Sequence, residues 1–185
     1  LNMKIALISI FLDDGYEHIL DDEFMENVVC QEDHYYHRIA HLLRMGNHDP
    51  IVFYISVEKE LKKFTHKYGH TVIRVPAKRI PFLHEPIVYS PELIKQVENN
   101  FDASLLFSYY VMYKVPDMFD YIIRKLKGKM PIMTRWSGGQ HKWLFPIRKQ
   151  IKKSALQKCD KIICGGREEI EVLKNVFKIP NSKIE

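Results

Sequence analysis

The chain has 185 residues and a formal net charge of +5, from 28 Lys and Arg against 23 Asp and Glu. With 46% hydrophobic and 28% charged residues, the composition is that of a globular domain and excludes disordered and fibrous proteins. No apolar run approaches the roughly 18–20 residues that a membrane-spanning helix requires.

Strand and helix signals alternate along the chain. Residues 4–11 form a continuous apolar run, as expected of a strand buried on both faces. After an acidic stretch, residues 34–45 have helical periodicity, and Gly46 and Asn47 end that helix. Residues 77–90 contain Pro81 and Pro86, with Pro91 just beyond, and are expected to be a long excursion. The other expected elements are strand 51–56, helix 57–68, strand 71–75, helix 91–99, strand 102–108, helix 116–127, strand 131–134, helix 146–158, strand 161–164 and helix 167–177.

This alternation predicts an α/β fold. Parallel strands need crossover helices, and the crossovers are right-handed, so the helices cover both faces of the sheet. We therefore expect a Rossmann-like, doubly wound, mostly parallel sheet of about six strands. Ligands of such sheets lie beyond the carboxyl ends of the strands, which directs attention to the residues after 4–11, 102–108, 131–134 and 161–164.

The two ends of the chain and its cysteines bear on domain organisation. Leu1 and Asn2 precede Met3, which indicates that the natural start is Met3. The chain stops at Glu185, soon after a polar turn, where a domain seldom ends. We expect one domain over residues 3–185, cut from a longer protein. The three cysteines give no paired disulfide framework, so the expected compartment is the cytoplasm, with peripheral membrane contact as an option.

Polar residues and glycines follow the first and fourth strands. Asp13 and Gly15 come after the first strand, and one glycine does not satisfy the Gly-x-Gly-x-x-Gly pattern, which argues against an ordinary NAD or FAD domain. Tyr109 follows the fourth strand, where it would either stack on a sugar or nucleobase or be a half-buried rim residue.

The fifth and sixth strands are followed by the clearest local site signals. Arg135, Trp136, Ser137 and Gly138 suit recognition of an anionic or carbohydrate group, and the alternative is a plain loop. Arg167 opens the last helix, whose free amides would hold an anion or serve only as a helix cap.

Charge is unevenly distributed. Residues 12–33 contain nine acidic residues and no Lys or Arg, whereas residues 121–159 contain eleven Lys and Arg and no Asp or Glu. The basic stretch indicates either an anionic partner or a solvated face. Its helix has two interpretations: Ile147, Ile151 and Ala155 pack on the sheet while the lysines face water, or the region docks on an anionic membrane. The docking residues would be Trp143, Arg148, Lys149, Lys152 and Lys153.

Metal-ligand signals are weak. His34, His37 and His41 share one face of the first helix, opposite Tyr35, Ile39, Leu42 and Leu43. We expect these histidines to face outward or toward the cleft at the helix end, and predict no metal site, because no carboxylate or cysteine clearly converges on them. Cys159 and Cys164 flank a strand at a spacing that common zinc motifs do not use, which favours structural cysteines.

The order of four stretches carries a family resemblance. They are residues 3–8, residues 42–49, residues 131–134 with the glycines that follow, and residues 159–164 with the exit at 179–184. The last pattern, an aspartate before an apolar strand and a Pro-x-x-Lys-Ile exit, is the most specific. Together they resemble the N-terminal half of a GT-B glycosyltransferase of the large retaining family (family 4-like). Trp136-Ser137 and the single Gly15 depart from the family, which often has a histidine-glycine pair and a glycine-richer first loop at these places.

The resemblance implies a Rossmann-like domain that binds the acceptor, a glycan or lipid-linked sugar. It also implies a second domain, absent from this chain, that binds the nucleotide-sugar donor, and no covalently bound cofactor. Under this interpretation Arg135, Ser137 and Gly138 line the cleft, Tyr109 contacts the acceptor and Arg167 faces a phosphate; no catalytic residue is assigned. One alternative is a stand-alone, non-catalytic nucleotide- or ligand-binding Rossmann module. Nucleic-acid binding through residues 121–159 is disfavoured, because the sequence has no recognised DNA or RNA module.

Overall fold

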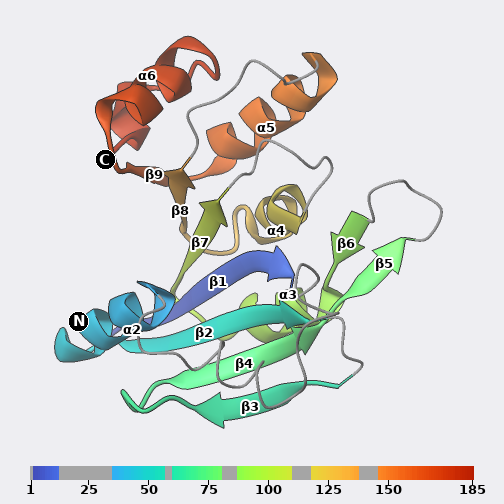
Figure 1. Cartoon of the computed structure of the whole chain (residues 1–185), viewed down its shortest axis with the longest axis vertical. Helices are drawn as coiled ribbons and strands as arrows, with labels where there is room; N and C mark the ends of the chain where they lie inside the picture. The colour runs from blue at the N-terminus through green and yellow to red at the C-terminus, as the bar shows by residue number, and fades with distance from the viewer. Residues whose placement is uncertain (1, 13–34, 57–59, 81–86, 110–117, 138–145) are drawn as a thin grey trace.

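The computed structural model describes residues 2–12, 35–56, 60–80, 87–109, 118–137 and 146–185. Its centre is a seven-stranded sheet with strand order β3-β4-β2-β1-β7-β8-β9, beside a two-stranded sheet of β5 and β6 (Figure 1). The strands are β1 (Lys4–Leu12), β2 (Asp49–Ser56), β3 (Lys62–Thr65), β4 (Thr71–Pro76), β5 (Lys78–Ile80), β6 (Ile87–Tyr89), β7 (Ala103–Tyr109), β8 (Ile132–Ser137) and β9 (Lys161–Cys164). The helices are α2 (Tyr35–Met45), α3 (Pro91–Val97), α4 (Met118–Leu126), α5 (Pro146–Lys158), α6 (Arg167–Asn175) and the 3-10 turn η2 (Asn181–Lys183).

The main sheet is parallel except for β3. Strand β1 pairs with β2 on one side and with β7 on the other, so it lies at the centre, and only β3 runs antiparallel to its neighbour β4. Helices follow most of the parallel strands, as a crossover connection requires. The predicted Rossmann-like α/β fold is confirmed.

Helices cover both faces of the sheet. Along β1, Ile5 and Leu7 point into a cluster beneath α2, whereas Ala6 and Ile8 point into a larger cluster formed with α3, α4, α5 and α6. This alternation follows from the two-residue period of a strand, and apolar residues at every position are what a strand buried on both faces requires. Among the described residues, no helix is both long and apolar enough to cross a membrane.

The helix predicted over residues 57–68 is wrong. The described part of this segment contains the edge strand β3, followed by a turn into β4 that closes with a hydrogen bond from His66 N to His70 O at 2.9 Å. Gly69 has a φ of 78°, which serves a tight turn as well as it serves a helix end, so the glycine signal was correct but its interpretation was not. The short strand alternates between half-buried and exposed residues, with Phe64 packed beneath α2.

The start of α3 agrees with the sequence. Ser90 caps the helix, its Oγ accepting a hydrogen bond from Leu93 N at 3.1 Å and donating one to Pro76 O at 2.7 Å. Pro91 occupies the first helical position, where it loses no intrahelical bond. The excursion before this helix contains the antiparallel pair of β5 and β6, which the proline content did not indicate.

Candidate functional site

The carboxyl ends of β7, β8 and β9 lie side by side at one edge of the sheet. Tyr109 is opposite Ser137 in the ladder of β7 and β8, and Trp136 is opposite Cys164 in the ladder of β8 and β9. The sheet therefore brings together positions that are far apart in the sequence, as the parallel arrangement predicted. Asp13, Gly15 and Gly138, predicted for the same edge, lie outside the described residues.

Arg135 points to the α2 face of the sheet. Its guanidinium carbon lies 5.5 Å from the centre of the Tyr35 ring, a cation–π distance, and the side chain is half-buried. In the ladder, Arg135 aligns with Phe107 of β7, which in turn aligns with Ser9 of β1. Ser9 is buried, and its Oγ donates a hydrogen bond to the Tyr36 hydroxyl at 3.4 Å.

The same face carries a second polar pair on β2 and β4. Tyr54 and Arg74 are opposite each other and are exposed by only 7% and 2%. With Ser9, Tyr36 and Arg135 they form what we call the polar belt, which lies on the α2 face toward the carboxyl ends of the strands. The two guanidinium groups and three hydroxyls of the belt are of the chemical type that binds carboxylate, phosphate or sugar hydroxyl groups.

Trp136 has a different place from the one expected. It is 1% exposed, belongs to the cluster on the opposite face from α2, and meets the Phe177 ring edge-on at a centroid distance of 5.3 Å. Adjacent residues of a strand point to opposite faces, so Arg135 and Trp136 do not share one site. The tryptophan contributes to the core.

The first turn of α6 is partly satisfied from within the chain. Arg167 is exposed at the first position of α6. The Gly165 amide donates to a Glu169 carboxylate oxygen at 2.6 Å, and Glu168 and Glu169 both lie in the first turn. A carboxylate of the helix itself therefore occupies one of the donors that the sequence offered to an external anion.

Helix α5 does not have the two faces expected of it. Lys152, expected on the basic outer face, is fully buried and donates to Asp120 of α4 at 2.8 Å. Ile147, expected in the buried stripe, is 75% exposed next to the exposed Lys149, whereas Ala155 is buried. Lys153 is half-buried, Arg148 lies in the same helix, and Trp143 lies outside the described residues.

A cavity of about 470 Å³ opens between α4 and α5. Its walls include Asp120, Arg124, Gln150, Ser154 and Lys158, and none of the residues that the sequence singled out as ligand-binding. It lies on the face of the sheet opposite the polar belt, so it is not the site that the strand ends predict.

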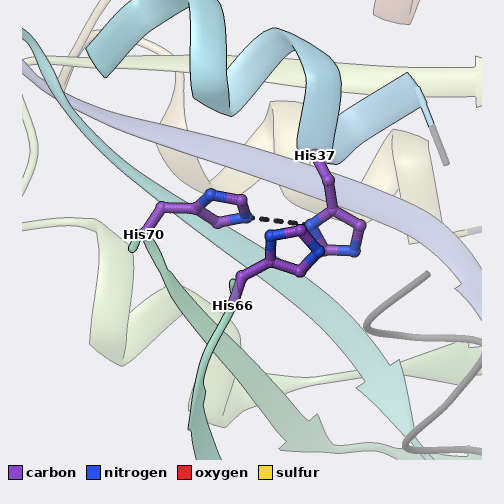
Figure 2. Close-up of side chains that lie close together, drawn as sticks. All are labelled: His37, His66 and His70. Atoms are coloured by element: carbon purple, nitrogen blue, oxygen red, sulfur yellow. Dashed lines mark hydrogen bonds between the residues drawn. The ribbon is translucent and has the colours of Figure 1, made fainter. Parts of the chain in front are cut away.

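Three histidines, His37, His66 and His70, lie close together beneath α2 (Figure 2). His37 of α2 is fully buried, and His66 and His70, from the two ends of the β3–β4 turn, are each 2% exposed. His37 Nδ1 lies 2.9 Å from His70 Nε2, and the His37 and His66 rings stack with centroids 4.1 Å apart. The expectation that the histidines of this helix face outward is therefore wrong for His37.

The buried face of α2 is shifted from the one expected. Its buried residues are Tyr36, His37 and Ala40, and Leu42 is 64% exposed. Of the apolar residues expected to face the sheet, Tyr35, Ile39 and Leu43 do pack against the cluster beneath α2, so the error concerns Leu42 and His37. Leu42, chosen for its hydrophobicity, faces outward.

The surroundings keep His70 uncharged. Burial, followed by the nearby His66, Arg44 and His41, lowers the pKa of His70 from 6.5 to about 4. At neutral pH the side chain is therefore a neutral imidazole, the form that accepts a hydrogen bond or binds a metal ion through a lone pair.

Sequence reasoning missed this cluster because His66 lies in the segment misread as a helix, residues 57–68, and His70 directly follows the glycine that was interpreted as the end of that helix. His66-Lys67-Tyr68-Gly69-His70 would place its histidines on one face of a helix, but on a hairpin it places them opposite each other across the turn. A glycine between two histidines, next to a β-branched strand, was the available signal.

The cysteines Cys159 and Cys164 behave as structural residues. Burial raises the pKa of the Cys159 thiol to about 12, and burial followed by Glu169 raises that of Cys164 to about 11. Both thiols stay protonated at neutral pH, which makes them poor nucleophiles and poor metal ligands.

Comparison with known proteins finds similarity at the level of the fold but not of the sequence. No protein-family model and no curated protein sequence matches the chain. Among solved structures, the sucrose-phosphate synthase from Thermosynechococcus elongatus is similar with a TM-score of 0.59 and 12% sequence identity. The match covers 99% of this chain and 47% of that protein, so the chain spans about half the length of its neighbour. The chain has a GT-B-like fold.

The structural match covers the part of the chain that carries the candidate site. The match extends over nearly the whole chain, so it includes the strands that carry the polar belt and the carboxyl edge of β7, β8 and β9. The resemblance seen in the sequence is thus supported at the level of fold. Arg135 is the predicted site residue whose described side chain lies in the polar belt, half-buried and next to an aromatic ring.

Proposed function

We propose that this chain is the acceptor-binding half of a glycosyltransferase that moves a sugar from a nucleotide-sugar to a glycan or lipid-linked acceptor. The observation that carries the proposal is the match of 99% of the chain to about half of a sucrose-phosphate synthase. A two-domain transferase would use its second domain to bind the donor. The part of the neighbouring protein that this chain does not match is long enough for such a domain.

The acceptor would bind at the carboxyl edge, with the polar belt behind it. Arg135 offers a guanidinium to a sugar hydroxyl or a phosphate, and Tyr109 and Ser137 lie side by side at the ends of their strands. Asp13, Gly15, Gly138 and the exposed Arg167 belong to the proposed edge by their place after the strands. Trp136 is left out, because its ring is in the core.

The reaction breaks one bond and forms another. The acceptor hydroxyl oxygen forms the glycosidic bond with the anomeric carbon, and the bond from that carbon to the diphosphate breaks. The nucleoside diphosphate leaves with the electron pair, and the hydroxyl proton passes to it or to solvent. The protein stabilises the negative charge that develops on the leaving diphosphate.

A lipid-linked acceptor would require the protein to approach a membrane. Helix α5 supports a peripheral contact, because Ile147 is 75% exposed beside the exposed Lys149. Lys152 takes no part, since its ammonium group is bound to Asp120. The proposed surface is therefore smaller than the one that the basic sequence indicated.

The test is binding of sugars to residues 3–185, measured by saturation-transfer NMR with a panel of oligosaccharides, glycolipid headgroups and nucleotide-sugars. We expect at least one acceptor-type sugar to bind, and Arg135→Ala to weaken it at least about tenfold, the effect of losing about 1.4 kcal/mol. Arg124→Ala is the matched control, since Arg124 is exposed on α4 on the other face of the sheet and its loss leaves the edge intact.

Two results would contradict the proposal. Binding of nucleotide-sugars alone would favour the stand-alone nucleotide-binding module. Complete sugar transfer by residues 3–185, without a second domain, would contradict the division between an acceptor half and a donor half.

A further inference from the structure

We propose that His37, His66 and His70 form a binding site for a divalent transition-metal ion, with zinc the best fit. The site is separate from the carboxyl edge of β7–β9, and the inference does not depend on the proposed transferase activity. One ring nitrogen from each histidine lies within 4.8 Å of those of the other two, and all three residues are buried (Figure 2).

The donor set selects the metal. Three imidazole nitrogens suit Zn²⁺, Cu²⁺ and Ni²⁺, whereas Ca²⁺ and Mg²⁺ require oxygen ligands. Zinc is commonly held by three protein ligands with a water molecule in the fourth position. Among the described residues, the one group of side chains close enough to hold a metal ion consists of these three histidines, with no carboxylate or thiol.

His37 and His70 are already close to the required arrangement. Their facing nitrogens, Nδ1 of His37 and Nε2 of His70, are 2.9 Å apart and share one proton. A metal ion takes both lone pairs if that proton moves to the far nitrogen of its own ring, so binding changes a tautomer and leaves both rings neutral. Two nitrogens bound to one zinc ion at about 2.0–2.1 Å each need only a slightly larger separation.

Tyr54 supplies the outer support that a metal-bound histidine requires. Its hydroxyl lies 3.3 Å from His37 Nε2, so it accepts the N–H that remains when Nδ1 binds the metal. A hydrogen bond of this kind fixes the tautomer and the ring orientation. His70 Nδ1 is buried and has no hydrogen-bond partner among the described residues, so it is free to carry the displaced proton.

His66 must turn for the site to close. In the structure its Nδ1 accepts a 3.2 Å hydrogen bond from the Tyr68 amide, and its ring is nearly parallel to that of His37, at an angle of 9°. Stacked rings do not aim their lone pairs at one point. Metal binding therefore breaks the hydrogen bond from the Tyr68 amide and rotates the His66 side chain. Both residues lie in the β3–β4 turn, so we expect the rearrangement there.

Charge sets the expected affinity. Three neutral ligands leave the ion with its full double charge, and Arg44 lies close enough to affect His70. This repulsion and the cost of turning His66 make the site weaker than one with thiolate or carboxylate ligands. We expect a dissociation constant in the micromolar range, and a metal ion that links α2 to the edge hairpin.

The test starts from the full chain stripped of metal with a chelator. Zn²⁺ titration against a chromophoric competitor should give one equivalent bound. At a free Zn²⁺ concentration about 100 times the dissociation constant, the Tm should rise by about 5 °C or more. Co²⁺ should bind at the same site and give the intense visible absorption of a four-coordinate ion.

Variants locate the site. His66→Gln and His70→Gln should each lower the Zn²⁺ affinity at least about tenfold and weaken the Co²⁺ bands. His48→Gln is the matched control, because His48 lies after α2, is not one of the three proposed ligands, and leaves all three in place. Circular dichroism of each metal-free variant shows whether it is folded.

A measurement on the unmodified chain keeps the proposal testable if the variants unfold. The ¹⁵N shifts of the histidine ring nitrogens should change on Zn²⁺ addition for His37, His66 and His70. Three results would each overturn the proposal: less than 0.1 equivalent bound at micromolar Zn²⁺, unchanged affinity in folded His66→Gln and His70→Gln proteins, or ring shifts confined to other histidines.

Discussion

Arg44 and Gly69 hold the β3–β4 turn against the end of α2. The Arg44 guanidinium donates to the Tyr68 carbonyl oxygen, and it lies where a side chain at position 69 would begin. Gly69 also has a φ of 78°, a conformation that other residues adopt only with strain. The positive φ therefore favours glycine at this position, and a side chain there would also displace the Arg44 guanidinium.

Gly69→Ala should lower the free energy of unfolding by more than Gly128→Ala does. Gly128 has a similar φ of 82°, but a Cβ built there meets nothing within 4 Å, so its substitution costs only the backbone strain of about 1–2 kcal/mol. At Gly69 the Arg44 side chain must also move. Chemical denaturation of both variants measures the difference, and equal losses would show that the Arg44 contact has no energetic weight.

The residue scale is also where sequence reasoning was least reliable. Arg135 was singled out from its place after a strand, and the structure gives it an aromatic neighbour and partial exposure. Trp136 was chosen by the same argument, but it points to the other face because neighbouring residues of a strand alternate. A correct prediction needed the face assignment of β8, which the short apolar run of residues 131–134 did not supply.

At the scale of secondary-structure elements, the buried pair of Lys152 and Asp120 joins α5 to α4. The ammonium nitrogen lies 2.8 Å from an Asp120 oxygen and 5.5 Å from the centre of the Phe119 ring, and neither charged side chain is more than 3% exposed. Removing one partner of a buried pair leaves a charge that neither water nor protein compensates.

Lys152→Met should therefore lower the free energy of unfolding by about 3–5 kcal/mol. Lys149→Met, in the same helix but exposed, should change it by less than about 0.5 kcal/mol. The double variant Asp120→Leu/Lys152→Met should recover most of the loss, because no unpaired charge remains. Equal stability of Lys152→Met and Lys149→Met in urea denaturation would contradict the role of the pair.

Across the whole molecule, protection of the sheet should follow the strand order. Strand β1 is flanked on both sides, with residues 6–8 fully buried, whereas β3 is an edge strand in which Lys63 and Thr65 are exposed. The other edge strand, β9, is covered by the end of the chain, where Glu185 N donates to Ile162 O at 2.9 Å.

Amide hydrogen exchange should therefore be slowest in β1 and β7, and faster in β3 than in β9, because local opening requires fewer broken contacts at an uncovered edge. Metal-free protein is the proper sample, since an ion bound by His66 and His70 would slow exchange next to β3. Exchange in β3 as slow as in β1 would show that the hairpin opens only with the whole sheet.

The sequence alone determined the class of fold, and the edge at which a ligand would bind stays a prediction from the parallel arrangement. Continuous apolar runs such as residues 4–11 predict strands buried on both faces. Helices between successive strands predict that the strands run parallel, because each helix provides the crossover that parallel strands need. These signals come from consecutive residues, so they can be recognised without knowing which segments pack against them. The order of motifs also indicated the GT-B-like fold that the structural comparison supports.

Only the tertiary structure decided which polar residues meet. His37, His66 and His70 lie up to 33 residues apart and come together because β3 is an edge strand and not a helix. Lys152 is buried because Asp120 of another helix lies opposite it. Both results depend on contacts between distant segments, and such contacts override the local preference that a short stretch of sequence expresses.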